Sequence, residues 1–172
     1  MKKKRHQFLK RSLKKLNHLS NLNPMNVFVT KRYEFDAAHR LPNHKGACRY
    51  IHGHRYAIEV TVKATVNSQA NSPTEGMVID FQDLKEIVKN QIVDVWDHTL
   101  LLYKNDPLLK NSSTFIDQRV VQTDYVPTAE NMARDAFESL KKRISDMSSS
   151  NPITLVKVRL YETPTTWVDV EL

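Results

Sequence analysis

Valine, isoleucine, tyrosine and phenylalanine gather in four segments of the chain, and one segment alternates strictly between apolar and polar positions. Its apolar positions are Tyr56, Ile58, Val60 and Val62, and they alternate with Ala57, Glu59, Thr61 and Lys63. An apolar residue at every second position is typical of a strand with one buried face. The other three segments are residues 26–35, 156–163 and 167–172. The pattern therefore predicts four strands, two in the first part of the chain and two at its end.

Two segments between these strand pairs have apolar residues at helical spacing instead. The first runs from Asp80, a residue type that caps helix N-termini, to Trp96, and its apolar positions are Phe81, Leu84, Val88, Ile92 and Val95. The second follows Thr128, another capping residue type, and its apolar positions are Ala133, Ala136, Phe137, Leu140 and Ile144. Between them, residues 97–126 predict a long irregular loop with one short extended piece at residues 119–123.

The order of these elements is strand, strand, helix, helix, strand, strand. This ββααββ order predicts an α+β domain in which an antiparallel four-stranded sheet carries two helices on one face. Such an open sheet exposes unpaired strand edges, and closing several copies into a barrel removes those edges. We therefore expect a homo-oligomer.

Composition adds limits to this picture. The chain has 172 residues, 40% of them hydrophobic, which suits one domain. No apolar run approaches the ~18 residues of a membrane span, and the start of the chain has no signal-peptide pattern, so we expect a cytoplasmic protein. The one cysteine, Cys48, cannot form an internal disulfide and is free for chemistry.

The net charge of +7 is unevenly distributed. Residues 1–24 contain eight Lys or Arg and no acid, which leaves about −1 for the rest of the chain. The basicity therefore belongs to a flexible extension over residues 1–25, and residues 26–172 form a nearly neutral globular domain. A neutral domain makes a nucleic-acid partner unlikely as the main function.

Four of the seven histidines lie between His39 and His54. On a strand His52 and His54 point to the same face, so they can converge on one cation with His39 from a neighbouring segment. Three imidazoles leave one of the four tetrahedral positions of zinc open, as in catalytic zinc sites. Two alternatives remain at this point: scattered polar histidines, or a closed structural site in which Cys48 is the fourth ligand.

Six short segments resemble the 6-pyruvoyl-tetrahydropterin synthase family, in the family's order. They are residues 35–41 (FDAAHRL), 48–54 (CRYIHGH), 76–81 (GMVIDF), 96–98 (WDH), 127–131 (PTAEN) and 161–163 (YET). Within the family the chain is most similar to the bacterial 6-carboxy-tetrahydropterin synthases of the queuosine pathway. The chain departs from the family at Trp96, where leucine is usual, and the resemblance does not cover residues 1–26 or 100–125.

The resemblance implies the tunnelling fold, a β-barrel built from subunits, commonly as a hexamer of two trimers with active sites between subunits. It also implies the conversion of 7,8-dihydroneopterin triphosphate into 6-carboxy-tetrahydropterin, acetaldehyde and triphosphate. Three residues separate Cys48 from His52, which is typical of the carboxy type, and the pyruvoyl type of synthase is the alternative. Ile51 before His52 argues against the branch that feeds folate synthesis. A more distant alternative is a zinc-stabilised binding module without enzymatic activity.

The resemblance also implies a role for each candidate site residue. His39, His52 and His54 are the zinc ligands, and Cys48 is the catalytic base. Asp97 and His98 relay protons, although His98 could instead be a histidine that favours a helix end. Glu162 continues the apolar alternation of Val156, Val158 and Leu160 on its strand, so its carboxylate needs a partner, and the pterin ring offers a pair of donors. The resemblance assigns Glu162 both to pterin anchoring and to the catalytic relay. Glu130 supports the pterin pocket, although an acid in a first helical turn is favourable without any ligand.

Overall fold

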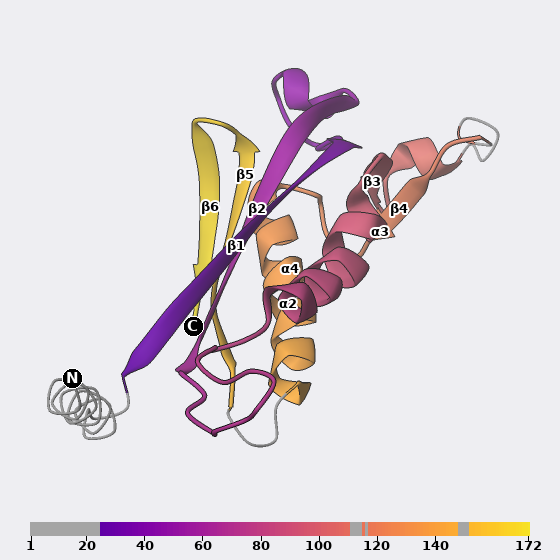
Figure 1. Cartoon of the computed structure of the whole chain (residues 1–172). Coiled ribbons are helices and arrows are strands. Elements are labelled where there is room, and N and C mark those ends of the chain that lie inside the picture. Colours follow the sequence, from indigo (N-terminus) through magenta and orange to yellow (C-terminus); the bar gives the residue numbers. More distant parts are fainter. Residues whose placement is uncertain (1–24, 111–114, 116, 148–151) are drawn as a thin grey trace, which may run out of the picture.

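The structure, a computed structural model, describes residues 25–110, 115, 117–147 and 152–172. All but Met25 of the predicted N-terminal extension lies outside the described residues. The sheet has six strands in the order β4-β3-β1-β2-β5-β6 (Figure 1). The strands are β1 Asn26–His39, β2 His52–Thr65, β3 Thr99–Tyr103, β4 Val120–Thr123, β5 Thr154–Thr163 and β6 Thr166–Glu171. The predicted α+β class is confirmed, and the predicted count of four strands is wrong.

The four predicted strands form the antiparallel part of the sheet. β1 and β2 pair along their whole length, from Asn26 opposite Thr65 to His39 opposite His52. Both strands put alternate residues into the core, because a strand turns successive side chains to opposite faces. β5 pairs with β2 and β6, and a register shift opposite residues 61 and 62 changes its alternation. For this reason Leu155, and not the predicted Val156, is buried at the start of β5.

The two additional strands come from the segment that was predicted to be irregular. β3 runs parallel to β1 and pairs there with residues 37–39 alone. On its other side β3 pairs with β4, which also runs parallel to it. β4 coincides with the short extended piece predicted at residues 119–123. The run in β3 is a short apolar stretch without alternation, a pattern that does not distinguish strand from buried helix. A short 3-10 helix, η3 (Pro107–Lys110), follows β3.

The first predicted helix forms, but it contains a π-helical turn. It consists of α2 (Phe81–Val88), the π turn η2 (Lys89–Val93) and α3 (Asp94–Trp96), and the side chain of Asp80 accepts a hydrogen bond from the Gln82 amide at its start. A π turn inserts one residue, so the buried face rotates after it. Val93 and Trp96 are therefore buried in place of the predicted Val95, which is 40% exposed. Phe81 is also exposed, because it lies in the first turn of the helix.

The second helix, α4 (Ala129–Asp146), matches its prediction. The Thr128 side chain caps it by accepting a hydrogen bond from the Asn131 amide, and all five predicted apolar positions are buried. Both long helices lie on the same side of the antiparallel strands (Figure 1), and the core fills the space between the helices and the sheet. The opposite face of the sheet is polar, with ion pairs such as Arg32–Glu59 and Arg159–Asp169. None of the helices in the described residues is long and apolar enough to span a membrane.

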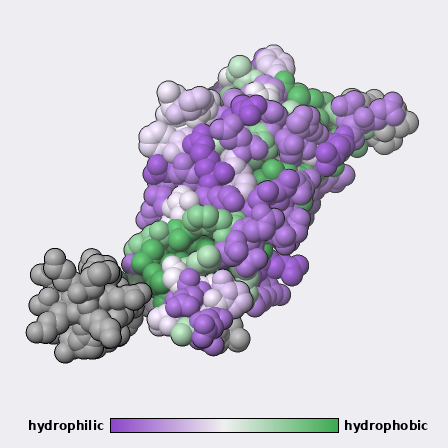
Figure 2. All heavy atoms as spheres, viewed as in Figure 1, coloured by the Kyte–Doolittle hydropathy of each residue, from purple (hydrophilic) through white to green (hydrophobic). Residues whose placement is uncertain are grey.

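Two features of the surface are left without a partner in the single chain. Residues 26–36 of β1 pair on one side only, and β4 and β6 are the end strands of the described sheet. Exposed apolar side chains gather near the start of β1 and the end of β2 (Figure 2). We call the exposed residues Met25, Val27, Val66, Met77 and Phe81, at these strand ends and at the start of α2, the apolar patch. Open edges and apolar patches both favour association.

Candidate metal centre

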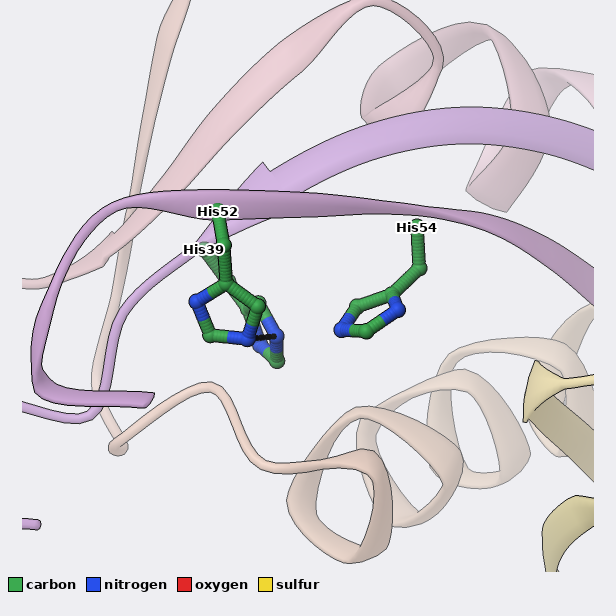
Figure 3. A group of neighbouring side chains, drawn as sticks. All are labelled: His39, His52 and His54. Atoms are coloured by element: carbon green, nitrogen blue, oxygen red, sulfur yellow. Dashed lines mark hydrogen bonds between the residues drawn. The ribbon is translucent and has the colours of Figure 1, made fainter. Parts of the chain in front are cut away.

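Three histidines converge at the end of the β1–β2 pair. His39 closes β1 directly opposite His52, which opens β2, and His54 lies two residues further along the same face. One nitrogen of each ring lies within 4.8 Å of the others, and Figure 3 shows the three rings turned toward one space. Gly53 allows the two strands to approach here, since a Cβ atom at this position would lie 3.2 Å from the Ala37 carbonyl oxygen.

The hydrogen bonds of these rings determine which nitrogens are free. Nδ1 of His39 lies 2.7 Å from the Pro127 carbonyl oxygen, and Nδ1 of His52 lies 2.9 Å from the Tyr50 carbonyl oxygen. A carbonyl oxygen only accepts, so each Nδ1 donates and each Nε2 keeps a lone pair. Burial is the largest influence on the pKa of His39 and lowers it, which favours the neutral ring.

These free nitrogens fit a metal ion. Nε2 of His39 and Nε2 of His52 lie 3.2 Å apart, and the buried Nε2 of His54 has no hydrogen-bond partner among the described residues. Lone pairs that face one another inside a protein are unfavourable without a cation between them. Backbone carbonyls that fix the tautomer of histidine ligands are a recurring feature of zinc sites. The three histidines predicted as ligands therefore lie together, and one ring nitrogen of each is directed toward a common point.

A pocket of about 380 Å³ opens beside His39, and three other predicted site residues line it. They are Cys48, Glu130 and Glu162. Cys48 lies on a 3-10 turn, η1 (Ala47–Arg49), and is not among the atoms clustered within 4.8 Å of one another. This placement favours a three-histidine ligand set with the thiol beside it over the closed site with a cysteine ligand.

Glu162 is the acid nearest to the histidines. Its Oε1 lies 3.6 Å from Nε2 of His39 and 3.9 Å from Nε2 of His54. It follows the buried Val158 and Leu160 at alternate positions of β5, as predicted, and reaches the pocket at the end of that strand. Both distances exceed hydrogen-bond length, so the carboxylate faces the histidines and the pocket without binding either ring.

Asp97 and His98 form a hydrogen-bonded pair, but neither residue lines the pocket that contains Cys48. Oδ1 of Asp97 accepts hydrogen bonds from the Asp36 amide and from Nδ1 of His98, both at 2.9 Å. The Asp36 amide is the main reason why the pKa of Asp97 is lowered, and His98 adds to it. His98 has a positive φ of 55° and a largely exposed side chain.

His98 lines a second pocket, of about 570 Å³, together with Asp36, Arg55 and His54, and Asp97 contacts both His98 and the Asp36 amide beside it. Asp36 and Arg55 alternate with the core-facing positions of β1 and β2, so they point away from the face that carries His39. Within one chain, the structure therefore does not bring the Asp97–His98 pair into the pocket of Cys48.

The sequence did not predict that Tyr56 lies near the histidines. Its hydroxyl lies 3.3 Å from Nδ1 of His39. Its position two residues after His54 was the available signal.

Solved structures share this fold. The 6-pyruvoyl tetrahydropterin synthase of Caenorhabditis elegans is 27% identical, with a TM-score of 0.60 over 88% of this chain and 99% of that protein. An uncharacterised protein from Wolinella succinogenes gives a TM-score of 0.68 at 22% identity, over 86% of this chain and 98% of that one. The predicted tunnelling fold is therefore confirmed.

Proteins from other organisms are similar to this chain in sequence over most of its length. A relative from Rickettsia bellii named 6-carboxy-5,6,7,8-tetrahydropterin synthase is 33% identical over 145 residues, which is 84% of this chain and 99% of that protein. The protein of the same name from Haemophilus influenzae is 32% identical over 83% of this chain and 97% of its own length. These names agree with the prediction of an enzyme of the lyase class. The profile described as 6-pyruvoyl tetrahydropterin synthase matches residues 28–172, and the chain belongs to that family.

Proposed function

We propose that the protein is a zinc-dependent 6-carboxy-5,6,7,8-tetrahydropterin synthase of queuosine biosynthesis, acting in the cytoplasm. Its substrate would be 7,8-dihydroneopterin triphosphate, and its products 6-carboxy-tetrahydropterin, acetaldehyde and triphosphate. The observation that carries this proposal is the convergence of three imidazole nitrogens, two of which keep their lone pair because a carbonyl binds the other ring nitrogen, beside a pocket that holds Cys48 and Glu162. The names of the relatives from Rickettsia bellii and Haemophilus influenzae support the choice of reaction.

The metal would be held by His39, His52 and His54. Zinc in this place supplies a Lewis acid that stabilises negative charge as it develops on the substrate side chain. Cys48, in the same pocket, would act as a thiolate that takes a proton from a carbon of that side chain, and the thiol so formed would return a proton later in the reaction. The chemistry requires an acceptor and donor of protons that is not itself bound to the metal.

Two carboxylates would bind the pterin ring. Glu162 accepts hydrogen bonds from a ring N–H and from the exocyclic amino group, which form a donor pair suited to a carboxylate. Glu130 lines the same pocket from the first turn of α4 and supports the ring. The distance of 3.6 Å from Oε1 of Glu162 to Nε2 of His39 would put the bound ring next to the metal.

A second copy of the chain would complete the site. The Asp97–His98 pair is ordered by hydrogen bonds, but His98 lines a different pocket from Cys48. A proton relay by this pair therefore requires the pocket of one subunit to meet the Asp97–His98 pair of another. The open edges of β1 and β6 and the apolar patch support such an association, and we propose a hexamer of two trimers.

Product analysis tests the assignment. Purified protein with zinc and 7,8-dihydroneopterin triphosphate should release acetaldehyde and form 6-carboxy-tetrahydropterin in equal amounts. Formation of 6-pyruvoyl-tetrahydropterin without acetaldehyde would assign the protein to the pyruvoyl type, which shares this site and is the second candidate.

A further inference from the structure

A fully buried tyrosine lies against two of the three histidines. Tyr56 is 0% exposed and stacks on Phe35, the residue opposite it on β1, at 5.3 Å and 11°. Its ring meets His39 edge-on at 6.0 Å and His54 edge-on at 5.6 Å. Tyr56 is therefore the side chain through which the aromatic core contacts the histidine cluster.

The hydroxyl of Tyr56 lies 3.3 Å from Nδ1 of His39, which also lies 2.7 Å from the Pro127 carbonyl oxygen. The carbonyl requires a proton on Nδ1, so the hydroxyl oxygen is a second acceptor of the same N–H. A neutral oxygen at this place can accept without adding a charge to the site.

We propose that the Tyr56 hydroxyl is a positioning group that increases the zinc affinity of His39. The inference rests on the zinc site of the proposed function. An acceptor at Nδ1 fixes the tautomer and the orientation of the ring, and it makes Nε2 a better donor to a cation. Loss of such an outer contact typically lowers metal affinity by about 10–100-fold. Because the hydroxyl supplements the shorter Pro127 contact, we expect the lower end of that range.

Removal of this hydroxyl has a matched control in the same strand pair. Tyr33 lies on β1 and packs against the same core, but its buried hydroxyl has no hydrogen-bond partner among the described residues. Tyr56→Phe and Tyr33→Phe thus remove the same buried atom, from a fully buried ring and a partly buried ring respectively, and only the first removal takes a contact from a histidine. Zinc dissociation constants would be measured on the full chain by competition with a chromophoric chelator, without substrate.

The inference predicts about a 10-fold weaker zinc affinity for Tyr56→Phe and an unchanged affinity, within about 2-fold, for Tyr33→Phe. The metal-free melting temperature of Tyr56→Phe should stay close to that of the wild type, while the rise on adding zinc should shrink. Equal zinc affinities of Tyr56→Phe and wild type would overturn the inference, as would a variant that does not fold or melts lower even without metal. If the wild type itself binds no zinc, the proposed zinc site is wrong as well.

Discussion

At the scale of single residues, the hydrogen bonds of the histidines decide the chemistry of the site. Pro127 and Tyr50 fix the Nδ1 protons of His39 and His52 and leave Nε2 free to coordinate. The spacing of the histidines was enough to predict the cluster, because partners two residues apart on a strand share a face. The contact to Pro127 could not be predicted, since it joins residues 88 positions apart.

Replacement of Cys48 separates a catalytic thiol from a structural one. Cys48→Ala should lower turnover by about 10²–10⁴-fold, the usual range for loss of a general acid or base, and leave zinc binding intact. Acetaldehyde release and zinc content by atomic absorption would be measured on the same samples. Loss of zinc together with folding would instead support the zinc-stabilised binding module. Ser68→Ala, in the exposed polar loop after β2, provides the control.

Asp97 gives a pH-dependent effect on stability. Its pKa is lowered in the folded chain, mainly by the hydrogen bond from the Asp36 amide. The charged side chain therefore stabilises the fold at pH values above the ordinary pKa of an aspartate. That contribution is lost as the pH falls through the lowered pKa. Asp97→Asn should therefore be less stable than wild type at pH ~7, by less than about 1 kcal/mol because the group is near the surface. Urea unfolding of metal-free protein should show the difference shrinking toward pH ~3, and a constant difference would contradict this account.

At the scale of elements, local pattern predicted every long helix and strand but not the pairing of short ones. The apolar positions of α4 and the alternation in β2 agree with the structure because each element buries one face. β3 and β4 depend instead on a parallel contact with residues 37–39, far away in sequence. The π turn η2 has no apolar signature either, so the exposure of Val95 could not be foreseen.

A buried ion pair ties the β3–η3 segment to the end of β1. Nε of Arg40 lies 3.1 Å from Oδ2 of Asp106, whose side chain is fully buried. Asp106→Ala would leave the Arg40 charge without its partner, and such a loss typically costs about 3–5 kcal/mol. Urea unfolding should show a cost of this size. Asp124→Ala, which removes the acid of the exposed Lys104–Asp124 pair, should have a much smaller effect. Equal effects of the two variants would count against a structural role for the buried pair.

At the scale of the whole molecule, the single chain leaves strand edges of its sheet unpaired, as the order of elements in the sequence predicted. Four strands with two helices on one face leave a sheet with open edges, and this argument needed no structure. The apolar patch and the separation of the Asp97–His98 pair from Cys48 became visible only with the three-dimensional arrangement. Together these features indicate that the functional unit contains more than one subunit.

The apolar patch allows a test of association. The chain has a mass of 20.0 kDa, and sedimentation equilibrium at micromolar concentration should give about six times this mass if the proposed hexamer forms. Phe81→Glu places a charge in the apolar patch and should shift the distribution toward smaller species. Lys142→Glu, on the exposed side of α4, should leave it unchanged. A wild type that sediments as a single chain at every concentration would disprove the shared site.

We propose that a metal held by three histidines makes this pocket the active site of a 6-carboxy-tetrahydropterin synthase. Zinc titration of metal-free protein, with acetaldehyde release from 7,8-dihydroneopterin triphosphate as the readout, tests it most directly. The account predicts almost no release without zinc and a linear rise that ends at one zinc per chain. His52→Ala should remain inactive throughout the same titration. Full activity of the metal-free protein, or tight binding of one zinc per chain without any acetaldehyde, would contradict the account.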